Sequence, residues 1–147
     1  MNGLKENRLR YIVGVARKCY SLALERGHDE DFAKKMFMIG YLHDVGYEFT
    51  ERNYGHPEES ASLAKLIGCS TDVVQTIEKH GKYGNTNDEE YVILNTADML
   101  IDKDGNEVDV YERLEDIKKR YGEWSDTYLT ACDICYSLGL TSINLGA

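Results

Sequence analysis

The chain has 147 residues, 42% hydrophobic and 29% charged, with a formal net charge of −9 at pH 7. The length suits one domain, residues 1–147, and the balance is typical of a folded globular protein rather than a disordered one. The negative charge argues against sequence-independent binding to a nucleic-acid polymer or an anionic membrane, which requires clustered lysine and arginine. It still allows a small anionic substrate, because one local cation can outweigh a distant acidic surface.

The N-terminal stretch MNGLKENRLRYIVGV lacks the apolar segment of a secretory signal. No apolar run reaches the roughly 18 residues that a membrane span needs. We therefore expect a cytoplasmic protein whose four cysteines are reduced. Cys132 and Cys135 form a CxxC pair, but a structural zinc site usually needs a second pair at similar spacing, which the sequence lacks. Ordinary packing inside a helix is the predicted role of this pair.

Hydrophobic residues recur at helical spacing through almost the whole chain, which predicts an all-α fold of six or seven helices. The first helix is expected over residues 6–26, ending at Gly27, and the second runs to about residue 44. A short third helix begins at HPEES, with Pro57 at a favoured first position. The fourth helix is expected to have Ser70 or Thr71 as its N-cap residue and to end at His80. Three more are predicted over 88–102, 109–121 and 125–138, with the core between the first, second and fifth helices.

The second helix carries its apolar face directly into a histidine and an aspartate. His43 follows Met36 and Ile39 at helical spacing, and Asp44 ends the neighbouring stripe through Phe37. The pattern therefore predicts that His43 and Asp44 continue the buried face of this helix.

Two later helices repeat this intrusion of polar groups into an apolar face. His80 follows Ile77 at helical spacing, and Asp98 lies between Leu94 and Ile101. A single buried histidine or aspartate usually finds a partner within the core, but three such intrusions are harder to absorb, since each unpaired buried charge costs several kcal/mol. A shared divalent cation would satisfy them all, and histidine nitrogen with aspartate oxygen suits zinc, manganese and iron. His56, just before Pro57, is a further candidate ligand or phosphate contact.

The stretches MIGYLHDVG and LNTADMLID, in this order, resemble the HD superfamily of metal-dependent phosphohydrolases. The resemblance covers roughly residues 8–120, with the helices over 109–138 continuing the domain. It implies that His43, Asp44 and Asp98 bind one or two divalent ions, with manganese, iron, zinc, magnesium and nickel not distinguished. His56 and His80 fall where binuclear members, including the HD-type symmetrical diadenosine tetraphosphate hydrolases, carry additional ligands.

The sequence departs from the family pattern at two tyrosines. Tyr11, in LRYIVGVARKC, stands where the family's first histidine is expected, and Tyr47 stands where many members have a lysine. The first change removes a ligand, and the second removes a positive charge near the phosphate position. We expect both tyrosines to face the substrate, with Arg52 and Lys82 as the candidate cations at the mouth. A solvated surface charge is the competing interpretation of each cation.

The resemblance implies a metal-dependent phosphohydrolase acting on a nucleotide or another small phosphorylated metabolite. Asp44 and Asp98 would be its catalytic residues, since each would bind metal and either could accept the proton of the attacking water. The alternative, favoured by Tyr11, is a catalytically weak HD-fold module that binds a metal or nucleotide for regulation. A purely structural helical domain is the third hypothesis, which the clustered histidines and aspartates disfavour. No nucleic-acid polymer or membrane is expected as a partner, and a homo-oligomer is left open.

Overall fold

A computed structural model describes residues 6–45 and 56–142, with side chains over 8–45 and 57–142. These residues form seven α-helices and no β-strand. The helices are α1 (Glu6–Glu25), α2 (Glu30–Leu42), α3 (His56–Leu66), α4 (Thr71–Lys79), α5 (Glu89–Met99), α6 (Val110–Tyr121) and α7 (Asp126–Ser137). The predicted all-α class and the predicted number of helices are confirmed.

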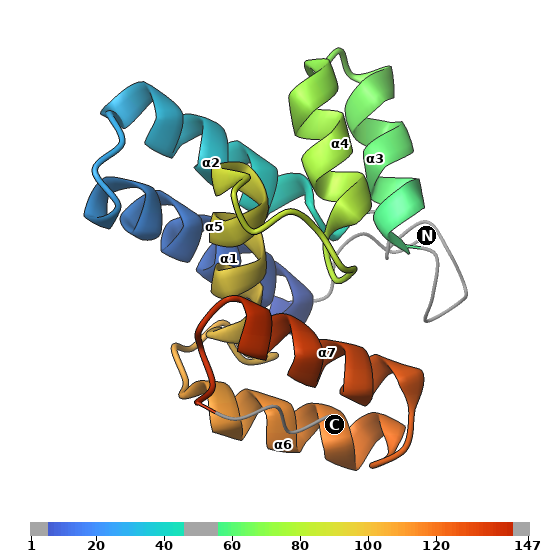
Figure 1. The fold of residues 1–147 in the computed structure, drawn as a ribbon. Helices are drawn as coiled ribbons and strands as arrows, with labels where there is room; N and C mark the ends of the chain where they lie inside the picture. The colour runs from blue at the N-terminus through green and yellow to red at the C-terminus, as the bar shows by residue number, and fades with distance from the viewer. Residues whose placement is uncertain (1–5, 46–55, 143–147) are drawn as a thin grey trace.

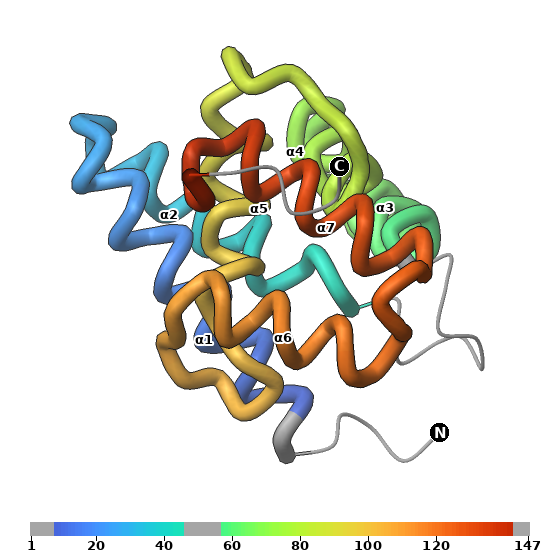
Figure 2. The backbone as a smooth tube through the Cα atoms, turned by 60° about the horizontal axis from the view of Figure 1, so that its bottom comes forward, coloured from blue at the N-terminus to red at the C-terminus, as the bar shows by residue number. Residues whose placement is uncertain are grey.

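The helices form three pairs around α5. Figure 1 shows α1 beside α2, α3 beside α4, and α6 beside α7, with α5 in the middle. The tube in Figure 2 shows the same α6–α7 pairing from another direction. Helix α5 contacts α1, α2, α4 and α6. A side chain on α5 can therefore meet residues that lie far away in the sequence.

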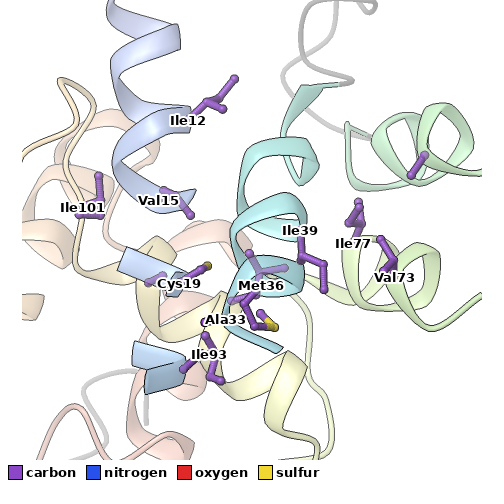
Figure 3. Packing of buried hydrophobic residues seen from close by; sticks show 14 of the residues in the cluster. Ile12, Val15, Cys19, Ala33, Met36, Ile39, Val73, Ile77, Ile93 and Ile101 are labelled. Atoms are coloured by element: carbon purple, nitrogen blue, oxygen red, sulfur yellow. The ribbon is translucent and has the colours of Figure 1, made fainter. Parts of the chain in front are cut away.

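The main core lies between α1, α2 and α5, as the sequence predicts. Val15 of α1, Met36 of α2 and Ile93 of α5 are fully buried in one cluster. Figure 3 shows Ile39 of α2 on the side of this core that faces Ile77 of α4. Helix α4 is thus part of the same packing, which brings the end of α4 close to the end of α2.

A glycine sets how closely α2 approaches α1. A Cβ atom added at Gly40 would lie 2.8 Å from the Cα atom of Ala16, which is closer than non-bonded carbon atoms pack. Any side chain at this position would push the last turn of α2 away from α1. Because His43 follows within one turn, Gly40 also determines where that imidazole lies.

Two helix ends differ from the sequence prediction. Helix α2 ends at Leu42, so His43 is its C-cap residue rather than a residue inside the helix. Helix α4 ends at Lys79, and His80 has extended backbone angles of φ −68° and ψ 145°. Helix ends depend on the hydrogen bonds of the last carbonyls, which a hydrophobic period does not report.

Two local expectations about packing and capping also change. Phe37 is exposed. The buried face of α2 is centred on Met36 and Gly40, and Phe37 lies beside this face rather than on it. Ser70 occupies the N-cap position of α4 but makes no capping hydrogen bond, and its hydroxyl donates to Asp72 Oδ1 at 2.5 Å. The position of this cap was predictable, whereas its side-chain geometry was not.

A second, smaller hydrophobic cluster joins α6 to α7. Cys132 and Cys135 are buried free thiols in this cluster, packed with Leu114 and Ile117. Burial raises the pKa of Cys135 to about 12, so this thiol stays protonated at neutral pH. The predicted packing role of the CxxC pair is confirmed.

Within the described residues, no helix combines the length and apolar character that crossing a membrane requires.

Candidate metal centre

Three helix ends bring the predicted ligands together. His43 and Asp44 follow α2 directly, His80 follows α4 directly, and Asp98 lies in the last turn of α5. His43, Asp44 and His80 are buried and each offers a ligand atom, all within 4.8 Å of one another. Asp98 joins them from α5, since its Oδ1 atom lies 3.8 Å from Nε2 of His43. The grouping predicted from three separate helices is therefore present in space.

Both histidines are oriented by hydrogen bonds from the outer ring nitrogen to a main-chain carbonyl. The Nδ1–H group of His43 donates to Gly40 O at 2.6 Å, and that of His80 donates to Ile77 O at 2.5 Å. Each bond places the proton on Nδ1 and turns Nε2 towards the carboxylates. Nε2 of His80 lies 3.9 Å from Oδ1 of Asp44. This arrangement is the one that metal-binding histidines use.

The donor set fits a divalent cation. Two imidazole nitrogens and two carboxylates point at one another, and all of these atoms are electron-pair donors when the histidines are neutral. Nε2 of His43 is buried and has no hydrogen-bond partner among the described residues. A buried polar atom without a partner costs roughly 1–3 kcal/mol, and a cation at this point would remove that cost. Mixed nitrogen and oxygen donors suit several first-row metals, so the residues alone do not select one.

Burial and neighbouring charges shift the pKa values of the two histidines in opposite directions and lower that of Asp98. Burial and the neighbouring His43 lower the pKa of His80 to about 4, so His80 is neutral at pH 7. Burial opposes protonation of His43 as well, but the carboxylates of Asp98 and Asp44 outweigh it and raise the pKa of His43. Burial of Asp98 is likewise outweighed, by His43 and Arg113, which hold the pKa of Asp98 well below its usual range. Asp98 is thus ionised, as a metal ligand must be.

Tyr11 lies inside the centre, on the inner face of α1. Its hydroxyl donates a hydrogen bond to Oδ1 of Asp98, and its ring centroid lies 5.9 Å from that of His43. Burial, together with the charge of Asp98, raises the pKa of Tyr11 well above its ordinary value. The phenol is therefore a neutral donor to a carboxylate rather than a phenolate ligand.

Two arginines that the sequence analysis did not select also reach the centre. Nη1 of Arg8 donates to Oδ2 of Asp44 at 2.9 Å. Nε of Arg113 donates to the main-chain oxygen of Asp98 at 3.3 Å, and its Nη2 atom lies 3.9 Å from Oδ1 of Asp98. Arg8 was detectable, because it lies one helical turn before Tyr11 on the same face. Arg113 belongs to a later helix and has no such local signal.

Asn95 is a third residue that the sequence analysis missed. Its Oδ1 atom accepts from the main-chain N–H of Gly81 at 2.8 Å, and its Nδ2 atom donates to Tyr91 O at 2.8 Å. Asn95 thereby fixes the residue that directly follows His80. The signal was a buried amide in the apolar stretch ILNTADMLI, three residues before Asp98.

The remaining candidates lie elsewhere or outside the described residues. Lys82 is 46% exposed, and its ammonium pairs with Glu58 on the surface, as a solvated charge would. His56 begins α3, but its side chain lies outside the described residues. Tyr47 and Arg52 also lie outside them.

The match to a family model decides which family the chain belongs to. The HD domain matches residues 10–117, most of the chain and all four residues of the centre. The chain belongs to the HD domain family. HD domains bind divalent metals and are generally hydrolases of the metal-dependent phosphohydrolase type, which agrees with the donor set described above.

A curated protein shares part of this HD domain. The chain is 33% identical over 96 residues to ribonuclease Y from Oleidesulfovibrio alaskensis, which covers 65% of this chain and 18% of that protein. The HD domain described here thus spans less than a fifth of the length of the relative that it matches. No solved structure matches the chain at the same level of significance.

Proposed function

We propose that this HD domain is a metal-dependent phosphohydrolase acting on a nucleotide or another small phosphorylated metabolite. The observation that carries the proposal is the convergence of His43, His80, Asp44 and Asp98, with both imidazoles held in the ligand tautomer by main-chain carbonyls. A divalent cation held by these residues would acidify a water molecule and polarise a phosphoryl oxygen.

The chain's own residues supply orientation and proton transfer in this reaction. A water oxygen forms a bond to phosphorus, the bond to the leaving oxygen breaks, and the water proton passes to a carboxylate and then to the leaving group. Asp44 or Asp98 is the proton acceptor in this proposal. The low pKa of Asp98 suits a metal ligand. Tyr11 and Arg113 hold Asp98 in position from two other helices.

The charge of the chain supports a small substrate rather than a polymer. RNA is the competing substrate, because the curated relative is a ribonuclease by name. A net charge of −9 opposes the approach of a polyanion, whose binding depends on several lysine or arginine contacts to phosphates. A small phosphate ester needs only the local charge of the centre.

The test is phosphate release by manganese-loaded protein from a panel of nucleotides and p-nitrophenyl phosphate. We expect release by the parent and loss of at least about 100-fold in His43→Ala, since changes to residues that only hydrogen-bond to metal ligands already cost roughly 10- to 100-fold. His28→Ala is the matched control, because His28 is a partly exposed histidine outside the centre. Equal loss in both variants would contradict the proposed site.

A gel-shift titration with RNA at physiological salt separates the polymer hypothesis from the proposal. We expect no appreciable binding. Micromolar, salt-sensitive binding together with RNA cleavage would favour the ribonuclease activity instead.

The second candidate function is a regulatory module that binds a metal or nucleotide and turns over slowly. It is favoured by Tyr11, which supplies a hydrogen bond to Asp98 where the family pattern expects a ligand. Stoichiometric manganese binding without phosphate release from any substrate in the panel would support this candidate.

A further inference from the structure

Away from the metal centre, α1 forms one wall of a groove whose other wall is the turn that joins α5 to α6. This groove has a volume of about 580 Å³ and opens to solvent. The two walls touch where Gly14 of α1 meets Gly105 of the turn, because a Cβ atom added at Gly14 would lie only 2.7 Å from Gly105 O. Figure 2 shows this turn beside α1. The groove lies on a different face of α1 from Tyr11, whose hydroxyl reaches Asp98 in the metal centre.

The turn is held in one shape by hydrogen bonds to a single side chain. Oδ1 of Asp102 accepts from the main-chain N–H groups of Asp104 and Asn106, both at 2.9 Å. Gly105 has a φ of 85°, which residues with a Cβ atom rarely adopt, and a Cβ atom there would overlap the main-chain oxygen of Arg10. The main chain at Asp104 is therefore fixed beside the first turns of α1.

Two exposed charges of opposite sign line this groove, one on each wall. They are Arg17 on α1 and Asp104 on the turn, and neither side chain forms an ion pair with any residue that the structure describes. The other charged residues of the groove are already engaged, since Lys18 pairs with Glu107 at 2.6 Å and Arg10 has a contact of its own. Arg17 and Asp104 can therefore each take a partner from another molecule.

These two charges lie at different levels along α1. Asp104 directly precedes Gly105, which packs against the main chain of Arg10. Arg17 follows Arg10 by two helical turns, which is roughly 10 Å along the helix axis. Val13 lies midway between these levels and lines the same groove. An acid and a base thus stand on either side of an apolar midpoint.

A surface with this arrangement is complementary to itself. A two-fold axis that passes through Val13 at right angles to α1 places Asp104 of one copy opposite Arg17 of the other, and symmetry forms the same pair a second time. We propose that the groove between α1 and the turn from α5 to α6 is the interface of a homodimer in which the two α1 helices lie antiparallel. This inference does not depend on the proposed function.

A second copy suits the groove better than an anionic ligand does. A polyanion would meet the carboxylates of Asp104 and Glu107 on one wall, in a chain with a net charge of −9. A small anion would have to compete with Glu107 for Lys18. A partner with an acid and a base at matching positions satisfies both walls, and a second copy has them by symmetry.

The experiment is sedimentation equilibrium of the full chain at physiological salt over a series of protein concentrations. We expect a reversible dimer with a dissociation constant in the micromolar range, as is typical of a small interface. The net charge of −9 on each copy opposes association at long range, but salt screens this repulsion beyond about 8 Å. Circular dichroism and the thermal midpoint of each variant check that its fold is unchanged.

Charge reversal on either wall should weaken the dimer, and reversal on both should restore it. Arg17→Glu and Asp104→Lys should each raise the dissociation constant at least about 10-fold, because each places like charges opposite one another at two points. The double variant exchanges the signs of both pairs, so its dissociation constant should return to within about 3-fold of that of the parent. Net charge alone would instead weaken the Arg17→Glu dimer and strengthen the Asp104→Lys dimer.

Lys65→Glu is the matched control, because it changes the net charge as Arg17→Glu does but lies in the last turn of α3, outside the groove. Its dissociation constant should stay within about 3-fold of that of the parent. A parent that is monomeric at every concentration, or a dimer that Arg17→Glu leaves intact, would overturn the inference. So would a double variant as weak as the single variants, or an equal loss in Lys65→Glu.

Discussion

Two clusters in this molecule contain the same kinds of side chain but differ in burial. On the surface, Glu89 of α5 accepts two hydrogen bonds from Arg26, one from Nε at 2.8 Å and one from Nη2 at 2.5 Å. It accepts a third from Nε2 of His28 at 2.8 Å. These side chains are 28% to 43% exposed. In the metal centre, histidines, carboxylates and arginines meet in a site whose histidines are almost fully buried.

The difference between the clusters lies in how their polar atoms are satisfied. Glu89 has a donor for each of its oxygens, and water can reach the rest of the group, so the surface cluster needs no further ligand. In the buried cluster, Nε2 of His43 lacks a hydrogen-bond partner among the described residues and faces Asp98 across 3.8 Å. Residue type is therefore a poor guide to a metal site, whereas buried acceptors facing one another are a good one.

The strongest test of this comparison removes one carboxylate from each cluster. Asp98→Asn keeps the shape of the side chain but removes the charge. Manganese affinity should therefore fall by more than about 100-fold, which exceeds the usual loss when a hydrogen-bond partner of a metal ligand is removed. Glu89→Gln should leave manganese content unchanged. The measurement is elemental analysis after manganese loading and dialysis. Retention of the ion by Asp98→Asn would show that Asp98 is not a ligand.

The next test removes a support of the buried cluster without touching a ligand. Asn95→Ala deletes the acceptor of the Gly81 N–H, which should displace His80 and weaken manganese binding by roughly 10-fold. The loss of the buried hydrogen bond from Asn95 Nδ2 to Tyr91 O should also lower the free energy of unfolding by about 1–3 kcal/mol. Manganese titration and urea unfolding measure the two effects.

Asn85→Ala is the matched control for Asn95→Ala. Oδ1 of Asn85 also accepts from a main-chain N–H, that of Asn87 at 2.9 Å, but on an exposed turn. We expect little change in either measurement. If both asparagine variants behave alike, the amide of Asn95 does not position His80.

Tyr11→His tests whether the first helix faces the metal position. A neutral imidazole is a far better ligand than a neutral phenol, so manganese should bind about 10-fold more tightly, and phosphate release should rise. Tyr11→Phe, which removes only the hydroxyl bonded to Asp98, separates ligation from loss of the hydrogen bond. A histidine variant that binds manganese no better than the parent would mean that residue 11 does not reach the metal.

The smallest effect is expected from the surface cluster. Arg26 and His28 lower the pKa of Glu89 to about 2, below the ordinary value of 4.5 in the unfolded chain. The ionised carboxylate therefore stabilises the folded state above pH 4.5. This stabilisation is lost as the pH falls from 4.5 towards 2. Because the carboxylate is 35% exposed, Glu89→Gln should lower the free energy of unfolding at pH 7 by at most about 1 kcal/mol.

The measurement is urea unfolding of parent and Glu89→Gln at pH 7 and at pH 2.5. The difference between the two proteins should shrink at the lower pH. A difference that grows on acidification would have the wrong sign for a carboxylate with a lowered pKa.

The sequence by itself determined the helical fold and the members of the candidate centre. Helical periodicity depends on neighbours three and four residues apart, so it predicted that His43, His80 and Asp98 end or interrupt buried faces. The buried partners Ile39, Ile77 and Leu94 agree with that prediction. The order of the motifs then indicated the HD domain family, which the match over residues 10–117 confirms.

Only the tertiary structure decided which side chains support these residues. Arg113 reaches Asp98 because α6 packs on α5, and Asn95 reaches Gly81 because α5 packs on α4. The crossing of two helices is fixed by side-chain packing and by close contacts such as that of Gly40 with Ala16, not by the period of either helix alone. The same packing leaves Phe37 exposed and brings Arg8 onto Asp44, so the charges around the centre follow from the fold.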